Sequence, residues 1–405
     1  MRIHRLEVEG FRSLKKVSWE PGTLNVVIGP NGSGKSNLLR LLEFIQRLAF
    51  GGLKEYINRS GGFTNISWDG ESSPIKISSL LVDLSIHKFH QGFPPFPLGE
   101  QLAILYSCLI QENVPYLPII SEEKIFMQPT PPLSFMPKML MANRSGEDLS
   151  FFLLEEEHKQ DSSFLDKSES ILPYYTTNLN QYSVAPWALQ GNLKTWKIYQ
   201  YFDANKLSAV RQPAITSYEK AVGSDGYNII QVLHTLYTSD RNFESDIDSA
   251  MNAAFGNDYE KLVFPPAADQ RVQLRIRWKT LKREQSALDI SDGTLRFLYL
   301  MAILANPEPS PLIAIDEPET GLHPSMFPII AEFARECSRK SQVIFTTHSP
   351  QFLDAFGDRP PTTTVAQWQN GETILKVLDG ERLSKWLKHY SLGHMFMSGE
   401  LEAFD

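Results

Sequence analysis

Eight consecutive residues have the types and spacing of a loop that binds phosphate. Residues 29–36 read Gly-Pro-Asn-Gly-Ser-Gly-Lys-Ser and fit the pattern G-x-x-x-x-G-K-[ST] without a mismatch. Glycines let backbone N–H groups close round phosphate oxygens, Lys35 reaches the β- and γ-phosphates, and the Ser36 hydroxyl ligates Mg²⁺. The loop therefore predicts a site for a nucleoside triphosphate with Mg²⁺. The candidate binding residues are Gly29, Pro30, Asn31, Gly32, Ser33, Gly34, Lys35, Ser36 and Asn37.

The segments on both sides of this loop supply the context that it needs. Residues 24–28 form a short β-prone run that predicts a strand, and apolar residues then recur at helical spacing from Leu38 to Leu48. A helix that starts at the loop points its partially positive N-terminus at the phosphates. The expected order is therefore strand, glycine loop and helix.

Two adjacent acids end a second apolar run. Residues 311–315 show no alternation of polar and apolar side chains, which is typical of a strand buried on both faces of a parallel sheet. Asp316 and Glu317 follow at the carboxyl end, where α/β proteins bind ligands. We expect Asp316 to hold Mg²⁺ and Glu317 to orient and deprotonate an attacking water. The alternative is a strand whose end merely happens to be acidic.

Two further segments carry polar residues that could serve the same site. Residues 343–347 form a third apolar run, and His348 at its end could donate an imidazole N–H to a γ-phosphate. Residues 290–296 open a helix, where Ser291 and Gly293 could bind an anion at the N-terminus. Each segment has an ordinary alternative, namely a structural histidine and a plain helix N-cap.

The order of these four segments resembles that of the ATP-binding-cassette ATPases, and within them the SMC/RecF/RecN branch. Residues 29–36 resemble the Walker A motif of that family, and residues 312–317 resemble its Walker B motif. Residues 291–294, Ser-Asp-Gly-Thr, are similar to the signature motif but depart from the usual Ser-Gly-Gly-Gln. Residues 319–323 take the place of the D-loop, and His348 takes that of the switch histidine.

Two other features narrow the resemblance. Residues 8–13 resemble the N-terminal strand and arginine turn of RecF-like heads, which implies that Arg12 reaches the nucleotide. The variant signature, together with Glu-Pro-Glu-x-Gly-Leu-His-Pro at 317–324, is similar to the bacterial AAA_21-type ATPases. That group resembles the ATPase halves of overcoming-lysogenization-defect nucleases and of several anti-phage systems.

The resemblance implies an ATPase that works as a homodimer. In this family the phosphate loop of one copy meets the signature helix of another, so that ATP is bound between two heads. The Walker A and Walker B residues and His348 would act in cis, whereas Ser291 and Gly293 would act in trans on the γ-phosphate. The implied role is a nucleotide switch in DNA repair or anti-phage defence, working with a separately encoded effector such as a nuclease.

Two other functions remain as alternatives. A self-contained nuclease of the overcoming-lysogenization-defect type would need an appended catalytic domain with clustered acids, for which the stretch after His348 is too short. A transporter's nucleotide-binding subunit is disfavoured by the long insertion, the Arg12 turn and the variant signature. A response of the ATPase activity to DNA would separate the repair or defence role from the transporter role.

Composition and charge exclude some classes of protein. The chain has 405 residues and a formal net charge of −8, so any contact with DNA must be local. Its two cysteines, Cys108 and Cys337, offer neither a disulfide framework nor a metal-ligand spacing, as expected in a reducing cytosol. No uncharged apolar run approaches the roughly 20 residues that span a bilayer. We therefore expect a cytoplasmic protein without a membrane segment.

Changes in composition predict three parts. Residues 1–90 and 267–405 carry the motifs and are expected to form an α/β ATPase head, with a mixed sheet around the phosphate loop and a lobe that holds the signature helix. Residues 91–266 are expected to form a mixed, largely helical insertion that acts as a lid or binds a partner. Its first part is crowded with prolines up to Pro137, which predicts irregular structure there.

Four other segments have clear periodicity. Residues 189–202 and 227–254 predict amphipathic helices. Alternation over 271–279 predicts a strand with one basic face, which could meet a phosphate backbone or solvent. Residues 362–378 predict a hairpin with Asn-Gly at its turn, and a short helical tail is expected after it, at 381–390.

Three weaker signals have ordinary explanations. The acids at 246–248 could suggest a metal-dependent nuclease, but a single Asp-x-Asp on a polar helix is usually a solvated face. His87 and His90 lack the cysteine or acidic neighbours that a metal site needs. Neither Gln91 nor Gln101 lies in a persuasive context for the glutamine of the family's Q-loop.

Overall fold

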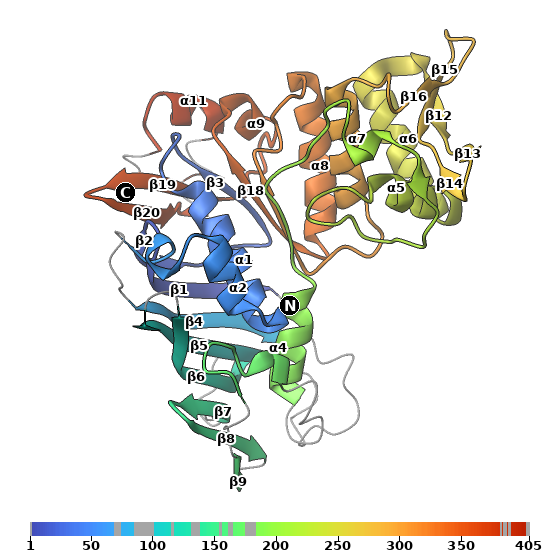
Figure 1. The fold of residues 1–405 in the computed structure, drawn as a ribbon. Helices are drawn as coiled ribbons and strands as arrows, with labels where there is room; N and C mark the ends of the chain where they lie inside the picture. The colour runs from blue at the N-terminus through green and yellow to red at the C-terminus, as the bar shows by residue number, and fades with distance from the viewer. Residues whose placement is uncertain are drawn as a thin grey trace. The chain divides into compact units, whose positions relative to one another are not determined.

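The first three strands of the chain are divided between two units of the fold. Figure 1 labels the helices and strands of the chain. Unit 1 comprises Met1–Gly22, Gly29–Trp196 and Thr364–Val377, and unit 2 comprises Thr23–Ile28, Lys197–Thr363 and Leu378–Asp405. The structure is a computed structural model, and it describes residues 2–68, 74–84, 101–114, 117–130, 138–153, 156–160, 165–174, 184–380, 383, 387 and 390–401. The three parts expected from the sequence, 1–90, 91–266 and 267–405, were defined by motifs and composition, whereas the two units are defined by contacts. The expected three-part division therefore stays a prediction.

Unit 1 is built on an antiparallel sheet in the order β2-β1-β4-β5-β6-β7-β8-β9. The alternation in β1 (Ile3–Phe11) buries Leu6 and Val8 completely. This strand pairs with β2 (Leu14–Trp19) on one side and with β4 (Ile75–Leu84) on the other. The remaining strands are β5 (Gln101–Val114), β6 (Leu117–Thr130), β7 (Met139–Ser145), β8 (Asp148–Leu153) and β9 (Glu156–Gln160).

The helix that follows the phosphate loop is fixed to this sheet. In α1 (Lys35–Phe50) the apolar residues from Leu38 to Leu48 are buried, and Phe44 lies with its ring centroid 5.3 Å from that of Phe11 in β1. Helix α1 packs against α2 (Leu53–Arg59) and α4 (Val184–Lys194), and both of these contact β6. A short 3₁₀ helix, η1 (Phe63–Asn65), follows α2.

The expectation of irregular structure in the proline-rich part is wrong over β5 and β6, which pair along their whole lengths. Pro118 is the second residue of β6, and Pro129 is the last but one. At these positions a missing backbone N–H interrupts little of the ladder of hydrogen bonds. The other prolines of that stretch, including Pro94, Pro115 and Pro137, lie outside the described residues.

One charged residue of β6 is completely buried. Glu123 accepts hydrogen bonds from Tyr106 Oη (2.7 Å), Ser170 Oγ (2.5 Å) and the Ile171 amide (2.9 Å). Burial raises the pKa of this carboxyl, and the three hydrogen bonds and the nearby Arg144 oppose the rise. The carboxylate thereby fixes the segment that contains Ser170 to the sheet.

A hairpin from the C-terminal part of the chain belongs to unit 1. β19 (Thr362–Gln369) and β20 (Glu372–Val377) pair around Asn370 and Gly371, whose φ angles are 49° and 85°. Positive φ at both positions is the mark of the type I′ turn that Asn-Gly predicts, so the predicted hairpin is confirmed. Trp19 Nε1 of β2 donates to Thr364 Oγ1 at 3.0 Å, which joins segments 345 residues apart.

Unit 2 contains four adjacent parallel strands. Their order is β10 (Lys197–Tyr199), β17 (Leu312–Asp316), β18 (Gln342–Thr347) and β3 (Leu24–Ile28). Every residue of β3 and β18 is buried, and so is β17 up to its last residue. Strands covered on both faces need no alternation of polar and apolar residues. The prediction that the apolar runs at 311–315 and 343–347 are strands is therefore confirmed.

The helical segment predicted over 227–254 is present in unit 2 as two helices, whereas the helix predicted over 189–202 is wrong beyond Lys194, where α4 ends and β10 follows. α5 (Ile229–Ser239) and α6 (Arg241–Phe255) both contact α7 (Asp292–Leu304), and α7 packs on α8 (Phe327–Ser338). Asp240 caps α6 by accepting hydrogen bonds from the amides of Asn242 and Phe243. The shorter helices are η4 (Ala209–Arg211), η5 (Gly256–Asp258), η6 (Pro324–Met326), α9 (Pro350–Asp354) and α11 (Leu392–Met397).

The single strand predicted over 271–279 is divided into two. β14 pairs with β11 and β13, whereas β15 pairs with β12 and β16. Burial still alternates across the break, with Val272, Leu274 and Ile276 buried. The alternation of the sequence predicts which face of a strand is buried, but it does not predict which strand is its neighbour. The bounds are β11 (Ala214–Ile215), β12 (Tyr259–Val263), β13 (Pro266–Ala267), β14 (Arg271–Val272), β15 (Arg275–Trp278) and β16 (Gln285–Ser286).

Candidate functional site

Lys35 is buried and folds back on the loop that precedes it. Its Nζ donates hydrogen bonds to the carbonyl oxygens of Gly29 (2.7 Å) and Pro30 (3.0 Å). Gly34, with a φ of 97°, is the N-cap of α1, so Lys35 and Ser36 form the start of the helix. The loop therefore curls round the lysine ammonium, as a phosphate-binding loop requires.

Two residues from distant parts of the sequence support the loop. Thr373 Oγ1 of β20 lies 2.7 Å from Ser13 Oγ and 3.0 Å from the Ser33 carbonyl oxygen. Asn37 Nδ2 donates to the same Ser13 Oγ at 2.7 Å. A Cβ on Gly34 would lie 1.9 Å from Thr373 Oγ1, so this position needs glycine for space as well as for its φ. The phosphate-loop pattern identifies neither residue: Ser13 is marked only as the end of the arginine turn at 8–13, and Thr373 belongs to none of the motifs above.

The start of α1 fits an anion such as the phosphates of a nucleotide. No side chain of the described residues caps the helix at Gly34, and its first turn holds no acid. The partial positive charge of the helix N-terminus is therefore not offset by an acid in its first turn. Ser33 Oγ is also buried without a hydrogen-bond partner among the described residues. Backbone amides, an ammonium and hydroxyls make up the donor set that phosphate oxygens need.

Arg12 lies in a strained turn next to Ser13. Its φ is 48°, and its amide donates to the Ile66 carbonyl oxygen at 2.8 Å. Burial lowers the pKa of the Arg12 guanidinium, and the neighbouring Tyr56 opposes this. Burial also raises the pKa of Tyr56 to about 12. The turn is therefore held in place by its own contacts, and the reach of Arg12 to a nucleotide stays a prediction.

In unit 2, the residues expected to do chemistry follow adjacent strands. Asp316 ends β17 and is followed by Glu317, and His348 directly follows β18. The phosphate loop begins at Gly29, directly after β3. Because β17, β18 and β3 are parallel neighbours, their carboxyl ends lie at one edge of the sheet, where ligands bind in α/β folds.

Glu317 and His348 are in direct contact. His348 Nδ1 lies 2.9 Å from Glu317 Oε1, and the two side chains are 44% and 36% exposed. Glu317 has a φ of 45°, a left-handed conformation that costs a residue with a side chain about 1 kcal/mol. Its amide donates to the Thr346 carbonyl oxygen at 3.0 Å, which holds this conformation at the end of β18. Strain of this kind is typical of a functional site.

Two threonines of β18 hold the other acids of the same loop. Thr346 Oγ1 donates to Asp316 Oδ1, and Thr347 Oγ1 donates to Glu319 Oε1. Burial raises the pKa of Glu319, although the hydrogen bond from Thr347 opposes the rise. The three acids thus have different surroundings, because Glu317 is partly exposed beside a histidine whereas Glu319 is buried.

The helix with the signature-like sequence has an ordinary cap within the single chain. Ser291 Oγ accepts from the Thr294 amide at 3.1 Å and lies 2.7 Å from Thr294 Oγ1. A Cβ on Gly293 would lie 2.8 Å from the Gly321 carbonyl oxygen, so glycine allows α7 to approach the loop after β17 closely. The action of Ser291 and Gly293 on a nucleotide of another copy stays a prediction.

Arg211 anchors the start of this helix and was missed by sequence reasoning. Its Nη1 donates to the carbonyl oxygens of Ala287 and Ile290, both at 2.6 Å, and its Nη2 forms an ion pair with Asp292. The side chain is only 1% exposed. Most of its partners are backbone atoms, which leave no pattern in the sequence, so no motif marks this arginine.

The predicted site residues fall into two groups that belong to different units. In unit 2, Glu317 and His348 contact each other, and α7 contacts the loop that carries Glu317. The residues of unit 1 are Arg12 and 29–37, and those of unit 2 are Ser291, Gly293, Asp316, Glu317 and His348.

The weaker candidates have structural roles or lie outside the described residues. Asp248 Oδ1 accepts from Tyr237 Oη (2.7 Å) and Tyr259 Oη (2.6 Å), which indicates a structural acid. On the basic strand, Arg277 donates to Glu284 Oε1 at 2.5 Å, so its charge is already paired. Outside the description lie His87, His90, Gln91, the side chain of Gln101 and most of the tail at 381–390.

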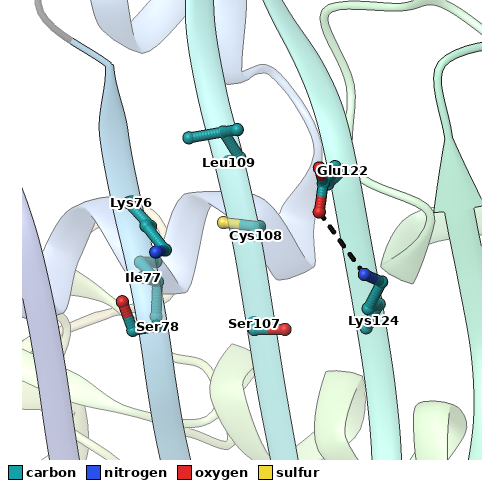
Figure 2. A pocket seen from close by; sticks show the side chains of 8 residues that line it. All are labelled: Lys76, Ile77, Ser78, Ser107, Cys108, Leu109, Glu122 and Lys124. Carbon is teal, nitrogen blue, oxygen red and sulfur yellow. Dashed lines mark hydrogen bonds and ion pairs between the residues drawn. The ribbon is translucent and has the colours of Figure 1, made fainter.

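A hollow of about 340 Å³ lies on the sheet of unit 1, where β4 bulges between Ile77 and Leu80 (Figure 2). Lys124 in this hollow lies 3.4 Å from Glu122, and burial raises the pKa of Cys108, so its thiol stays protonated at neutral pH. The hollow thus offers no activated nucleophile. Its lining residues are Lys76, Ile77, Ser78, Ser107, Cys108, Leu109, Glu122 and Lys124.

The parallel strands, the phosphate loop after β3 and the acid pair after β17 define an ATPase head of the ATP-binding-cassette class. A solved structure of "the SmcHead bound to the C-winged helix domain of ScpA" has the same kind of fold, with a TM-score of 0.55 and 13% identity over 95% of this chain and 100% of that one. The chain belongs to the AAA_21 family, described as "AAA domain, putative AbiEii toxin, Type IV TA system", whose sequence model matches residues 24–87 and 143–354. The predicted ATPase class and head fold are confirmed.

Two curated relatives agree with this class. An "OLD nuclease" of Thermus scotoductus is 21% identical over 366 residues, which cover 87% of this chain and 60% of that protein. An "ATP/GTP phosphatase" of Helicobacter pylori is 22% identical over 366 residues, 87% of this chain and 86% of that protein. This chain therefore spans less than two thirds of the length of the nuclease. In the described part of the chain, no helix is both long and apolar enough to cross a membrane.

Proposed function

We propose that the chain binds ATP with Mg²⁺, hydrolyses the ATP and dimerises through ATP-bridged heads, as a cytoplasmic switch in DNA repair or anti-phage defence. One observation carries the proposal, namely the contact of Glu317 with His348 at the ends of two parallel strands, next to the strand that leads into the phosphate loop. Membership of the AAA_21 family and the phosphatase relative support the ATPase part.

Each residue of the site then has a defined task. Bound Mg²⁺ would supply charge that stabilises the leaving phosphate oxygens. Lys35 would bind the β- and γ-phosphates, and Ser36 and Asp316 would hold the metal. Glu317 orients the attacking water and takes its proton. His348 holds the Glu317 carboxylate through Nδ1, and in its cationic form it can also donate from Nε2 to a γ-phosphate.

The signature segment supports a two-fold dimer. Ser291 and Gly293 begin a helix, and helix N-termini attract anions. In a symmetric dimer they would cap the γ-phosphate held by the other copy, so that two shared sites form. ATP binding would close the dimer and hydrolysis would open it. A separately encoded effector, such as a nuclease, would respond to that motion, and any contact with DNA would be local.

Glu317→Gln tests the catalytic assignment. The variant should bind ATP and form a dimer that persists, because the amide cannot accept the proton of the water. ATP turnover and light scattering with ATP measure this, and Glu336→Gln on an exposed face of α8 is the matched control. A Glu317→Gln protein that hydrolyses ATP at the rate of the wild type refutes the assignment.

Lys35→Ala should abolish ATP binding in calorimetry, whereas Lys16→Ala, at an 80% exposed side chain, should not.

A second candidate function is the ATPase part of a nuclease, which is favoured by the Thermus relative. DNA cleavage by the purified chain, with and without ATP and Mg²⁺, separates the two candidates. The switch proposal expects no cleavage without an added effector, whereas a self-contained nuclease cleaves alone. Stimulation of ATP turnover by DNA would also argue against a transporter subunit.

A further inference from the structure

Helix α7 contacts both ends of the loop that carries Glu317. At one end, the space for a Cβ on Gly293 is taken by the Gly321 carbonyl oxygen, 2.8 Å away. At the other end, Arg296 NH2 donates to the Glu317 carbonyl oxygen at 3.2 Å. Residues three apart share one face of a helix. The same turn of α7 therefore holds the loop at residues 317 and 321.

Two charged side chains at this contact, the half-buried Arg296 and the buried Glu319, each have one buried atom without a hydrogen-bond partner among the described residues. These atoms are Arg296 Nε and Glu319 Oε2. Glu319 is 8% exposed, and its other oxygen accepts from Thr347 Oγ1. Buried polar atoms are almost always paired, because losing water without gaining a partner is costly. An unpaired guanidinium N–H and an unpaired carboxylate oxygen in the same small region are therefore complementary.

Both groups are tied to the catalytic pair through short connections. Arg296 bonds the backbone of Glu317, whose left-handed conformation depends on such contacts. Glu319 bonds Thr347, and Thr347 Oγ1 accepts from the Ser349 amide at 2.9 Å, so both neighbours of His348 in the chain are held. A change in the position of α7 would therefore shift the backbone of Glu317 on one side and the residues next to His348 on the other.

We propose that Arg296 and Glu319 are a positioning pair, which couples the start of α7 to the orientation of Glu317 and His348. The inference rests on the proposed function, because α7 would be displaced by the nucleotide of a second copy. A small shift of α7 along the loop lets the Arg296 N–H meet the unpaired Glu319 oxygen. The contact of one copy with the nucleotide of the other would then set the catalytic geometry of its own site.

A double-mutant cycle on ATP turnover tests the pair. Arg296→Ala and Glu319→Ala should each lower kcat about tenfold or more with ATP affinity retained, because small misplacements of catalytic groups have large effects on rate. The double variant should lose little more than the worse single variant, because the two residues act together. Losses that multiply, or a loss of affinity with unchanged kcat, would overturn the pairing.

A second arginine provides the matched control. Arg335 on α8 also has a buried Nε without a partner among the described residues, and its NH2 also donates to a backbone oxygen, that of Phe356. Its hydrogen bonds with the described residues go to Glu332, Phe356 and Arg359, none of them in the loop at 317–321, so Arg335→Ala should reduce stability and leave kcat unchanged. If Arg335→Ala and Arg296→Ala lose the same stability and the same fraction of kcat, Arg296 acts only through folding, and the proposal is refuted.

Conservative variants keep the test decisive if an alanine variant does not fold. Arg296→Lys and Glu319→Gln should fold and show an intermediate kcat, since each keeps part of the hydrogen bonding. Wild-type kcat in both overturns the pair. The wild type separates the two hypotheses: a wild type that does not hydrolyse ATP refutes the proposed function, whereas an active wild type with equally active variants refutes only the pair.

Discussion

His348 Nδ1 lies 2.9 Å from Glu317 Oε1, and the two residues follow neighbouring parallel strands. The contact requires Glu317 to leave β17 in the left-handed conformation, since its amide bonds back to Thr346 in β18. Acid and histidine are thus positioned by the backbone of two buried strands.

This contact predicts a specific kinetic effect of His348→Ala. The histidine orients the carboxylate that takes a proton from water, so kcat should fall by about 100-fold or more, as for other groups that assist proton transfer. ATP affinity should be retained, because the Lys35 contacts are untouched. Single-turnover hydrolysis and calorimetry measure the two quantities. His4→Ala, at a 42% exposed histidine of β1, is the control; a similar fall in kcat there would contradict the assignment.

Two glycines of the phosphate loop should differ sharply on substitution by alanine. A Cβ on Gly34 meets Thr373 Oγ1 at 1.9 Å, whereas no described atom lies within 4 Å of a Cβ on Gly32. Both have positive φ, so Gly32→Ala should cost about 1 kcal/mol of strain. Gly34→Ala should cost about 1–3 kcal/mol more from overpacking. Urea unfolding measures the difference, and equal losses would show that Thr373 does not confine the loop.

Arg211→Ala should destabilise the protein by about 3 kcal/mol, because it leaves buried carbonyl oxygens without their donor. ATP turnover should fall as well, since the start of α7 loses its anchor. Asp292→Asn is the matched control: that side chain is 74% exposed, and the loss should stay below about 1 kcal/mol. If Arg211→Ala and Asp292→Asn lose the same stability, the stabilisation comes from the ion pair between Arg211 and Asp292 and not from the hydrogen bonds to the buried carbonyl oxygens.

Glu123→Gln should reveal a pH dependence of stability that belongs to Glu123. Because burial raises the folded-state pKa above its unfolded value, the folded state binds more protons. The stability of the wild type relative to the variant should therefore fall as the pH rises from the unfolded pKa to the folded pKa. Urea titrations over a pH series measure this difference. Glu122→Gln, at an exposed neighbour on the same strand, should show no such trend.

The sequence predicted the motifs and their strands because each is a local pattern. Buried parallel strands have apolar runs, and Asn370-Gly371 has one favourable turn. It could not predict Thr373 or Arg211 as parts of the site, because both act through backbone atoms far away in the chain. The proline-rich strands were missed because Pro118 and Pro129 occupy strand ends that composition cannot locate. The left-handed Glu317 and buried Glu319 also depend on tertiary contacts.

The contact of Thr373 with the Ser33 carbonyl oxygen has a consequence for the order of synthesis. It joins two positions that are 340 residues apart. A ribosome completes the whole phosphate-loop motif long before it makes the threonine that supports it. Nascent chains therefore carry the loop without its native support, and nucleotide binding of native quality arises only after the C-terminal hairpin has emerged. We therefore expect native ATP binding to require synthesis of the chain past the hairpin of β19 and β20.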